Sequence, residues 1–433
     1  MSTRNHAFLL CCLSSLLVTI LVFTAAETKA ENEVILADLT KEALETNPEI
    51  MAARANWQRT QAIIEARRAL PDPQFSYTYF IENIETRVGP QRNIFGLKQS
   101  FPFYGKRDIR AEVAQNEANA LKESYEAVKR RVIQQIKKTY YELFYIYKAI
   151  DITHDEKELL KRYEAIARTK YQTGIGNQQD ILKVQVEITN LNDKLLSLGD
   201  QKQTAQATIN TLLNRPPHQP LGRPIAPRIE KIPYGLDILL KMAEDRRQEV
   251  RATSALIKRN REAYRLAKRD YFPDLTLGVN YFDISQGPLS IADNGNDAWN
   301  IVFSINLPIW YNKLSSQVKS ALEGVRASQK FHRDALNVAL FEVKDNHYRL
   351  ITAQETIDLY ENALIPQAEQ SLKSAEAGYV AGKISFLDLL DAERVLLKIH
   401  FGYWRAMADH AQRLADLERA VGVDLSKIPE KQG

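Results

Sequence analysis

Two aspartates in the segment FLDLLDAE, Asp388 and Asp391, are the residues whose type and spacing most favour shared chemistry. They lie three residues apart, so on a helix they share one face, and neighbouring carboxylates can attract cations. The ordinary alternative is a solvated helix N-terminus, where acidic residues are favoured. The segment alone leaves both interpretations open.

Patterns typical of catalysis or of a resident metal are missing from the sequence. The seven histidines show no HExxH motif, no cysteine companions and no ligand spacing. Neither a glycine-rich phosphate loop nor a serine elbow is present. A net charge of +4 spread over 433 residues gives no reason to expect nucleic acid. We therefore expect no enzyme, no cofactor and no metal site. The histidines are His6, His154, His218, His332, His347, His400 and His410.

The two aspartates belong to a motif that the chain contains twice. A tyrosine, a glycine and an aspartate recur in register 208 residues later. In the first copy they are Tyr171, Gly174 and Asp180, and in the second copy Tyr379, Gly382 and Asp388. The recurrence indicates an internal duplication, with repeats at 31–217 and 218–433 and helical tips at 172–178 and 378–386. Both glycines are expected to end a helix in the left-handed conformation.

The first thirty residues differ from the rest of the chain. Arg4 precedes an apolar run from Ala7 to Phe23, and small residues follow at Ala26 and Ala30. This order is typical of a secretory signal peptide, with cleavage after Ala26 or Ala30. An uncleaved anchor helix is the alternative. Both cysteines of the sequence lie inside this run, so the exported chain would have none.

Long helices are predicted for most of the remaining chain, because 17 glycines and 16 prolines are few for this length. Residues 106–173 contain neither, and a helix over them would extend roughly 100 Å. Its apolar residues form one stripe, as in a coiled coil. Shorter helices are predicted at 34–70 and 236–271, and Pro366 predicts a kink near Leu364 in the second long helix.

Four strands are predicted from alternating apolar and polar residues. They cover about 73–81 and 93–101 in the first repeat, with a polar loop at 82–92, and about 274–282 and 299–307 in the second. Their length suits tilted strands that span a membrane, but four strands leave two open edges. We therefore predict a mainly α protein whose strands join those of other copies in a small membrane β-barrel. The alternative is a soluble hairpin layer covered by the helices.

The order of these elements, with FPFYGK and LPIWYNK at the strand exits, resembles the TolC-like outer membrane efflux proteins. The sequence segments from NPEIMAARANW through ALPDPQFSYTYF to LLNRPP are most similar to the heavy-metal cation efflux (CzcC-like) branch of this family. The resemblance covers essentially the whole chain after the leader. It implies a homotrimer with a 12-strand barrel in the lipid of a Gram-negative outer membrane and an α-helical tunnel in the periplasm.

The resemblance also implies partners and site residues. The tunnel would dock at its tips onto a periplasmic adaptor (membrane fusion protein) and an inner-membrane RND-type pump, and would be a passive exit duct for metal cations or small toxic compounds. Three copies of Asp388 and Asp391 would form a pore constriction. An Asp, a Tyr and an Arg lock the tips in this family. Asp180 and Tyr379 match, but the arginine position is Ile384, with Lys383 beside it.

The two copies of the tip differ in charge, since Lys183 is the counterpart of Asp391. We therefore expect the second repeat to hold the gate and the first to brace it, with the turns at Gly174 and Gly382 touching the adaptor. Two readings without a channel remain: a soluble periplasmic coiled-coil adaptor or scaffold protein, and a secreted helical interaction protein.

Overall fold

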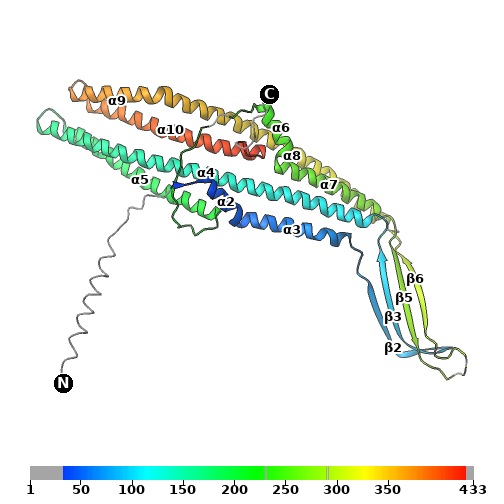
Figure 1. The fold of residues 1–433 in the computed structure, drawn as a ribbon. Coiled ribbons are helices and arrows are strands. Elements are labelled where there is room, and N and C mark those ends of the chain that lie inside the picture. Colours follow the sequence, from blue (N-terminus) through cyan, green and yellow to red (C-terminus); the bar gives the residue numbers. More distant parts are fainter. Residues whose placement is uncertain (1–32, 230–231, 289, 291, 426–433) are drawn as a thin grey trace, which may run out of the picture.

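The computed structural model describes residues 33–229, 232–288, 290 and 292–425, so the predicted signal peptide lies outside the described residues. One element order, two helices, two strands, a long helix and a return helix, runs twice along the chain (Figure 1). The elements of the first half are β1 (Glu33–Val34), α2 (Leu36–Thr46), α3 (Pro48–Arg68), β2 (Gln74–Thr86), β3 (Gly89–Phe101), α4 (Lys106–Gln172) and α5 (Gln178–Leu212). Those of the second half are β4 (Arg223–Pro224), α6 (Leu236–Arg246), α7 (Gln248–Arg269), β5 (Leu275–Ile284), β6 (Ala298–Ile305), α8 (Tyr311–Leu359), a π-helical turn (Tyr360–Leu364), α9 (Ile365–Val380) and α10 (Phe386–Val421).

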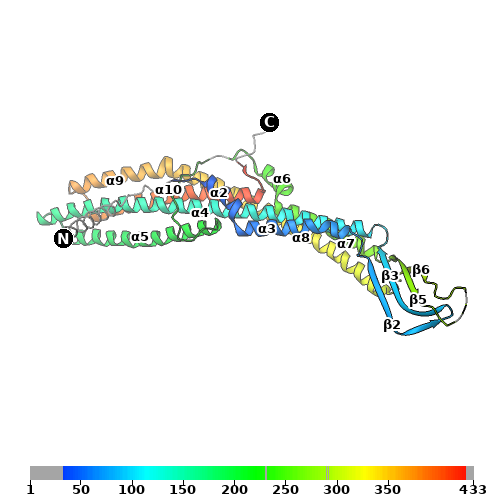
Figure 2. The ribbon, with the colours of Figure 1, turned by 60° about the horizontal axis from the view of Figure 1, so that its bottom comes forward.

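The molecule is elongated, with the four-stranded sheet at one end and the two helical tips at the other (Figures 1 and 2). Helix α4 has 67 residues and runs from the sheet to the first tip, which at 1.5 Å per residue is roughly 100 Å. The mainly α fold and the uninterrupted helix predicted over 106–173 are confirmed. Among the helices of the described residues, none combines the length and hydropathy needed to cross a membrane.

The helices that precede the strands are broken, so the single helices predicted at 34–70 and 236–271 are wrong. Asn47 leaves the helical conformation with ψ 121°, and its side chain accepts hydrogen bonds from the backbone N–H groups of Glu49 and Ile50. Pro48, which has no N–H to donate, then begins α3. Arg247 makes the same break between α6 and α7 with ψ 127°. At Asn47 a local side-chain cap therefore overrides the continuous apolar pattern, whereas the Arg247 side chain makes no such cap.

The sheet has the order β2-β3-β5-β6, and every neighbouring pair is antiparallel. The strands of the first hairpin have 13 residues each and are joined by a tight turn between Thr86 and Gly89. The polar loop predicted at 82–92 is therefore wrong, because strand pairing continues through its polar residues. Phe95 lies between Tyr77 and Tyr281 in the register, and Leu97 faces Val279, so one face of the sheet is apolar across all strands.

A π-helical turn, Tyr360–Leu364, interrupts the second long helix where a kink was predicted. Pro366 follows in the first turn of α9 and has no N–H for the helical ladder. The hydroxyl of Tyr360 lies against α10 at Gly402, where a Cβ atom would come within 2.3 Å of that oxygen. The position of the Tyr360 ring therefore depends on the missing side chain of Gly402.

Candidate functional site at the helical tips

The two tip turns have the same backbone geometry. Gly174 has φ 74° and Gly382 has φ 70°, a conformation that glycine adopts without steric cost. The backbone N–H of Gly176 donates to Lys170 O at 2.9 Å, and that of Lys383 donates to Gly378 O at 2.8 Å, so both turns tie off the preceding helix. The left-handed helix ends expected at these glycines are present.

The aspartates of the motif lie in the first turn of each return helix. Asp388 forms a capping box with Ser385: its carboxylate accepts the Ser385 backbone N–H at 3.0 Å, and Ser385 Oγ accepts the Asp388 N–H at 3.2 Å. Asp180 occupies the matching position in α5, where Asn177 provides the cap. Asp388 and Asp391 are both exposed. Asp388 thus stabilises the start of α10 and remains open to solvent.

The tyrosines of the two copies have different surroundings. Tyr379 is only 6% exposed and packs on Phe386, with the ring centroids 5.2 Å apart, whereas Tyr171 is exposed. Lys170 Nζ lies 3.9 Å from the centroid of the Tyr379 ring and donates to the Tyr379 carbonyl oxygen at 2.5 Å. Burial raises the pKa of the Tyr379 hydroxyl, and the Asp180 charge raises that pKa further. The structure thus brings Asp180 and Tyr379 near each other.

The cation that meets Tyr379 comes from the first repeat. Lys383, which sequence reasoning offered in place of the missing arginine, has an exposed side chain. Lys170 lies in the last turn of α4, and its ammonium group joins that helix to the end of α9. Sequence reasoning missed Lys170 because basic residues are ordinary in the last turn of a helix.

A buried acidic cluster lies between α4, α9 and α10, on the sheet side of the tips. Glu156 and Glu393 are 8% and 3% exposed, and their carboxyl groups are within hydrogen-bonding reach of each other. Burial, and then the hydrogen bond and charge of Glu393, raise the pKa of Glu156 to about 10. Burial also raises the pKa of Glu393. Nearby, Tyr163 Oη donates to Glu376 Oε1 at 2.6 Å.

The carboxyl groups of Glu156 and Glu393 are buried and close together, so at neutral pH the pair retains a proton. Leu160, Leu372 and Leu389 of the same three helices belong to one buried apolar cluster. Sequence reasoning missed the pair, because Glu156 lies in the charged run HDEKE, which is typical of a solvated helix face. No group of three or more histidine, cysteine or acidic residues within the described residues could hold a metal ion.

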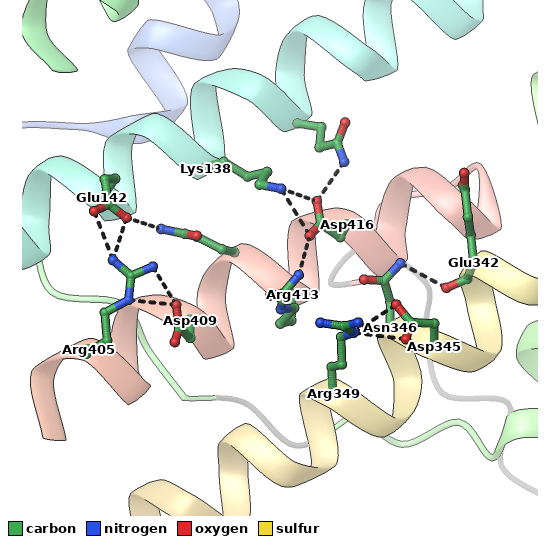
Figure 3. Close-up of polar contacts among 12 residues, drawn as sticks. Lys138, Glu142, Glu342, Asp345, Asn346, Arg349, Arg405, Asp409, Arg413 and Asp416 are labelled. Carbon is green, nitrogen blue, oxygen red and sulfur yellow. Dashed lines mark hydrogen bonds and ion pairs between the residues drawn. The ribbon is translucent and has the colours of Figure 1, made fainter. Parts of the chain in front are cut away.

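Farther from the tip, charged contacts hold α10 to α4 (Figure 3). Arg405 Nη1 donates to the Glu142 carboxylate at 2.7 Å and Arg405 also pairs with Asp409 on its own helix. Lys138 Nζ lies 3.0 Å from Asp416 Oδ1. The C-terminal half of α10 is thus fixed to α4 by ion pairs. Its tip half packs in an apolar cluster, and Arg394 pairs there with Glu187 of α5.

Comparison with known proteins identifies relatives along nearly the whole chain. The family model described as outer membrane efflux protein matches residues 39–215 and 239–423. The cobalt-zinc-cadmium resistance protein CzcC of Cupriavidus metallidurans is 19% identical over 385 residues, which cover 87% of each chain. The cation efflux system protein CusC of Escherichia coli O157:H7 is 24% identical over 384 residues, which cover 83% of this chain and 79% of that protein.

Solved structures agree with the fold. The outer-membrane channel OprN superposes with a TM-score of 0.78 at 18% sequence identity, and the superposition covers 89% of each chain.

Proposed function

The chain belongs to the outer membrane efflux protein family, and from this membership we propose that three copies assemble into one passive exit duct. As a member, the protein is an efflux channel of the Gram-negative outer membrane and not an enzyme. The proposal concerns its assembly, its gate, its partners and its cargo.

One observation carries the assembly: the four-stranded sheet exposes an apolar, aromatic face and has two open edges. Phe75, Trp299 and Phe303 are 69–73% exposed on that face. Strands β2 and β6 are the outer strands of the sheet order. Apolar side chains gain free energy by contact with lipid, and backbone groups at an open edge must find partners in a membrane. Edge-to-edge pairing of three copies, twelve strands in all, satisfies both requirements.

The gate is proposed at the second-repeat tip. In a threefold assembly the exposed Asp388 and Asp391 of three chains would surround one axis as an acidic constriction, which favours cations. Lys170 of the first repeat braces this tip through Tyr379, and the Asp180 charge acts on the same tyrosine. Lys383 and the turns at Gly174 and Gly382 remain available at its surface.

The partners and cargo follow from the relatives. CzcC is named for resistance to cobalt, zinc and cadmium, and CusC for cation efflux. We therefore propose the heavy-metal cation branch for this chain, with metal cations or small toxic compounds delivered by a periplasmic adaptor and an inner-membrane RND-type pump. The channel would conduct the cargo, and the pump would select it.

A sensitivity panel on a deletion strain tests this proposal. Loss of the gene should lower the tolerated concentration of at least one divalent metal several-fold while leaving dyes and detergents less affected, and the wild-type gene should restore growth. Increased sensitivity to organic compounds alone would overturn the metal branch. Unchanged sensitivity to every compound would overturn the export role in that cell.

A further inference from the structure

The two repeats meet inside one chain at an ion pair between a buried lysine, Lys106, and a half-buried aspartate, Asp274. Lys106, the first residue of α4, is 2% exposed. Its Nζ donates to Asp274 Oδ1 at 2.8 Å and to the carbonyl oxygen of Phe272 at 2.9 Å. Asp274 Oδ1 also accepts the backbone N–H of Phe103 at 2.7 Å. The exit of the first hairpin is thereby tied to the start of β5.

A ring stack and a strand register complete this junction. Phe103 and Phe272 stack with centroids 4.6 Å apart and an interplanar angle of 13°. Strands β3 and β5 then pair so that Leu97 faces Val279 on the apolar side of the sheet. The ion pair, the stack and the register are all formed where the second strand of repeat one meets the first strand of repeat two.

The duplicated sequence supplies the same parts a second time, at the two outer edges of the sheet. Pro71-Asp72 before β2 repeats Pro273-Asp274 before β5, and Lys313 in the first turn of α8 repeats Lys106. Leu70 stands where Phe272 stands, and Ile309 where Phe103 stands. All four residues at the outer edges, Leu70, Asp72, Ile309 and Lys313, are exposed.

Each outer edge of the sheet therefore carries an exposed charged residue and an exposed apolar residue. Within the described residues neither Asp72 nor Lys313 has an ion-pair partner, whereas their counterparts Asp274 and Lys106 pair with each other. The edge at β6 carries the lysine and the edge at β2 carries the aspartate. One chain cannot bring them together, but two copies side by side can.

We propose that β6 of one chain pairs with β2 of the next copy in the register of β3 with β5, and that Lys313 pairs there with Asp72 of the partner subunit. This inference rests on the proposed assembly and specifies its interface. In the duplication, Phe303 occupies the position equivalent to Leu97, and Tyr77 the position equivalent to Val279. In this register Phe303 therefore faces Tyr77 of the partner subunit. Neighbouring strands alternate in direction from β2 through β3 and β5 to β6. The pairing of β6 with β2 of the next copy is therefore antiparallel, like the others.

The register also keeps the apolar face continuous between copies. Phe303 and Tyr77 both lie on the apolar side of the sheet, as Leu97 and Val279 do. A slip of one residue would turn the side chains of one strand to the opposite face. Slips of two residues preserve the face but separate Lys313 from Asp72 of the partner subunit, so the ion pair fixes the register among them.

Disulfide trapping tests the register. In a chain with Cys11 and Cys12 replaced by serine, Phe303→Cys with Tyr77→Cys should form reductant-sensitive covalent trimers under mild oxidation. The matched pairs Phe303→Cys with Phe75→Cys and Phe303→Cys with Tyr79→Cys should crosslink at least several-fold more slowly. Faster crosslinking of either matched pair, or none from a protein that still runs as an oligomer, would overturn the register and leave the proposed export function intact. Monomers throughout would overturn both.

Charge exchange tests the ion pair. Lys313→Asp and Asp72→Lys should each lower the temperature at which the oligomer dissociates, and the double variant should restore most of the loss. Lys319→Asp, at another exposed lysine of α8, is the matched control and should leave that temperature near the wild-type value. Additive losses in the Lys313 and Asp72 double variant would overturn their pairing.

Discussion

Replacing Glu156 with glutamine should make the protein more stable at neutral pH, although Glu156 is a buried residue where α4 meets α10. The folded chain holds the pKa of Glu156 at about 10, against an ordinary value of 4.5 in the unfolded chain. At any pH between these values, folding must bind a proton that the unfolded carboxylate has released. At about 1.4 kcal/mol per pH unit above 4.5, the cost at pH 7 is about 3 kcal/mol.

The sign follows from the raised pKa. Stability from this group is fully present below pH 4.5 and is lost as the pH rises toward 10. Glutamine has no proton to bind and retains an amide that can donate to Glu393, so Glu156→Gln should remove this dependence. The advantage of the variant should be below about 1 kcal/mol at pH 5 and about 3 kcal/mol at pH 7.

Thermal unfolding followed by circular dichroism between pH 5 and pH 8 measures this effect. The difference in Tm between Glu156→Gln and the wild type should widen steadily with pH. Glu369→Gln, at an exposed position of α9, is the matched control and should follow the wild type. A difference in Tm that is the same at every pH, or a variant less stable than the wild type at pH 8, would refute the shared-proton account of the buried pair.

Four further substitutions, one of them a control, address the tip, the π-helical turn and the strand junction. Lys170→Met removes the ammonium group from the tip tyrosine and should lower the opening free energy of that turn by about 1–2 kcal/mol, measured as faster amide exchange there. Gly402→Ala places a Cβ within 2.3 Å of the Tyr360 hydroxyl and should lower Tm, whereas Gly324→Ala in open space should raise stability by up to about 1 kcal/mol. Lys106→Met removes the lysine from the half-buried Asp274 carboxylate and should cost about 1–3 kcal/mol, seen as oligomers that dissociate at lower temperature.

Each of these has an outcome that contradicts it. Amide exchange at the second-repeat tip unchanged in Lys170→Met would mean that the lysine does not brace the tip, and Lys170→Arg should keep the wild-type exchange. If Gly402→Ala and Gly324→Ala change Tm equally, a clash with the Tyr360 side chain is not the cause of the change. Dissociation of Lys106→Met oligomers at the wild-type temperature would show that the ion pair between Lys106 and Asp274 does not stabilise the contact between the repeats.

The long helices were predictable because their cause is local. A stretch without glycine or proline that keeps an apolar stripe has one regular conformation available, and α4 ends within one residue of the predicted limit. The alternation of Phe75, Tyr77 and Tyr79 likewise predicted a strand. Strand pairing then extended β2 to Thr86, through residues whose polarity indicated a loop, since a neighbouring strand satisfies backbone groups whatever the side chains are.

The tip residues were predictable only as a motif. The duplication located Tyr379, Gly382 and Asp388, but not the partner of the tyrosine. Lys170 reaches Tyr379 from a helix 209 positions away in the sequence, and the pairing of Glu156 with Glu393 is equally nonlocal. Contacts of this kind arise from the packing of α4 against α9 and α10, which no spacing within either helix records.

Single-channel recording of the purified protein in planar lipid bilayers tests the central claim most directly. The account predicts discrete, cation-preferring conductance steps from the wild type, and larger steps with weaker cation preference when Asp388→Ala and Asp391→Ala are combined. The pair Asp193→Ala with Asp200→Ala, exposed acids of the first-repeat return helix away from the tip, should change the cation preference less. Absence of conductance from the wild-type oligomer would contradict the channel, and identical conductance and selectivity in the Asp388 and Asp391 double variant would contradict the gate.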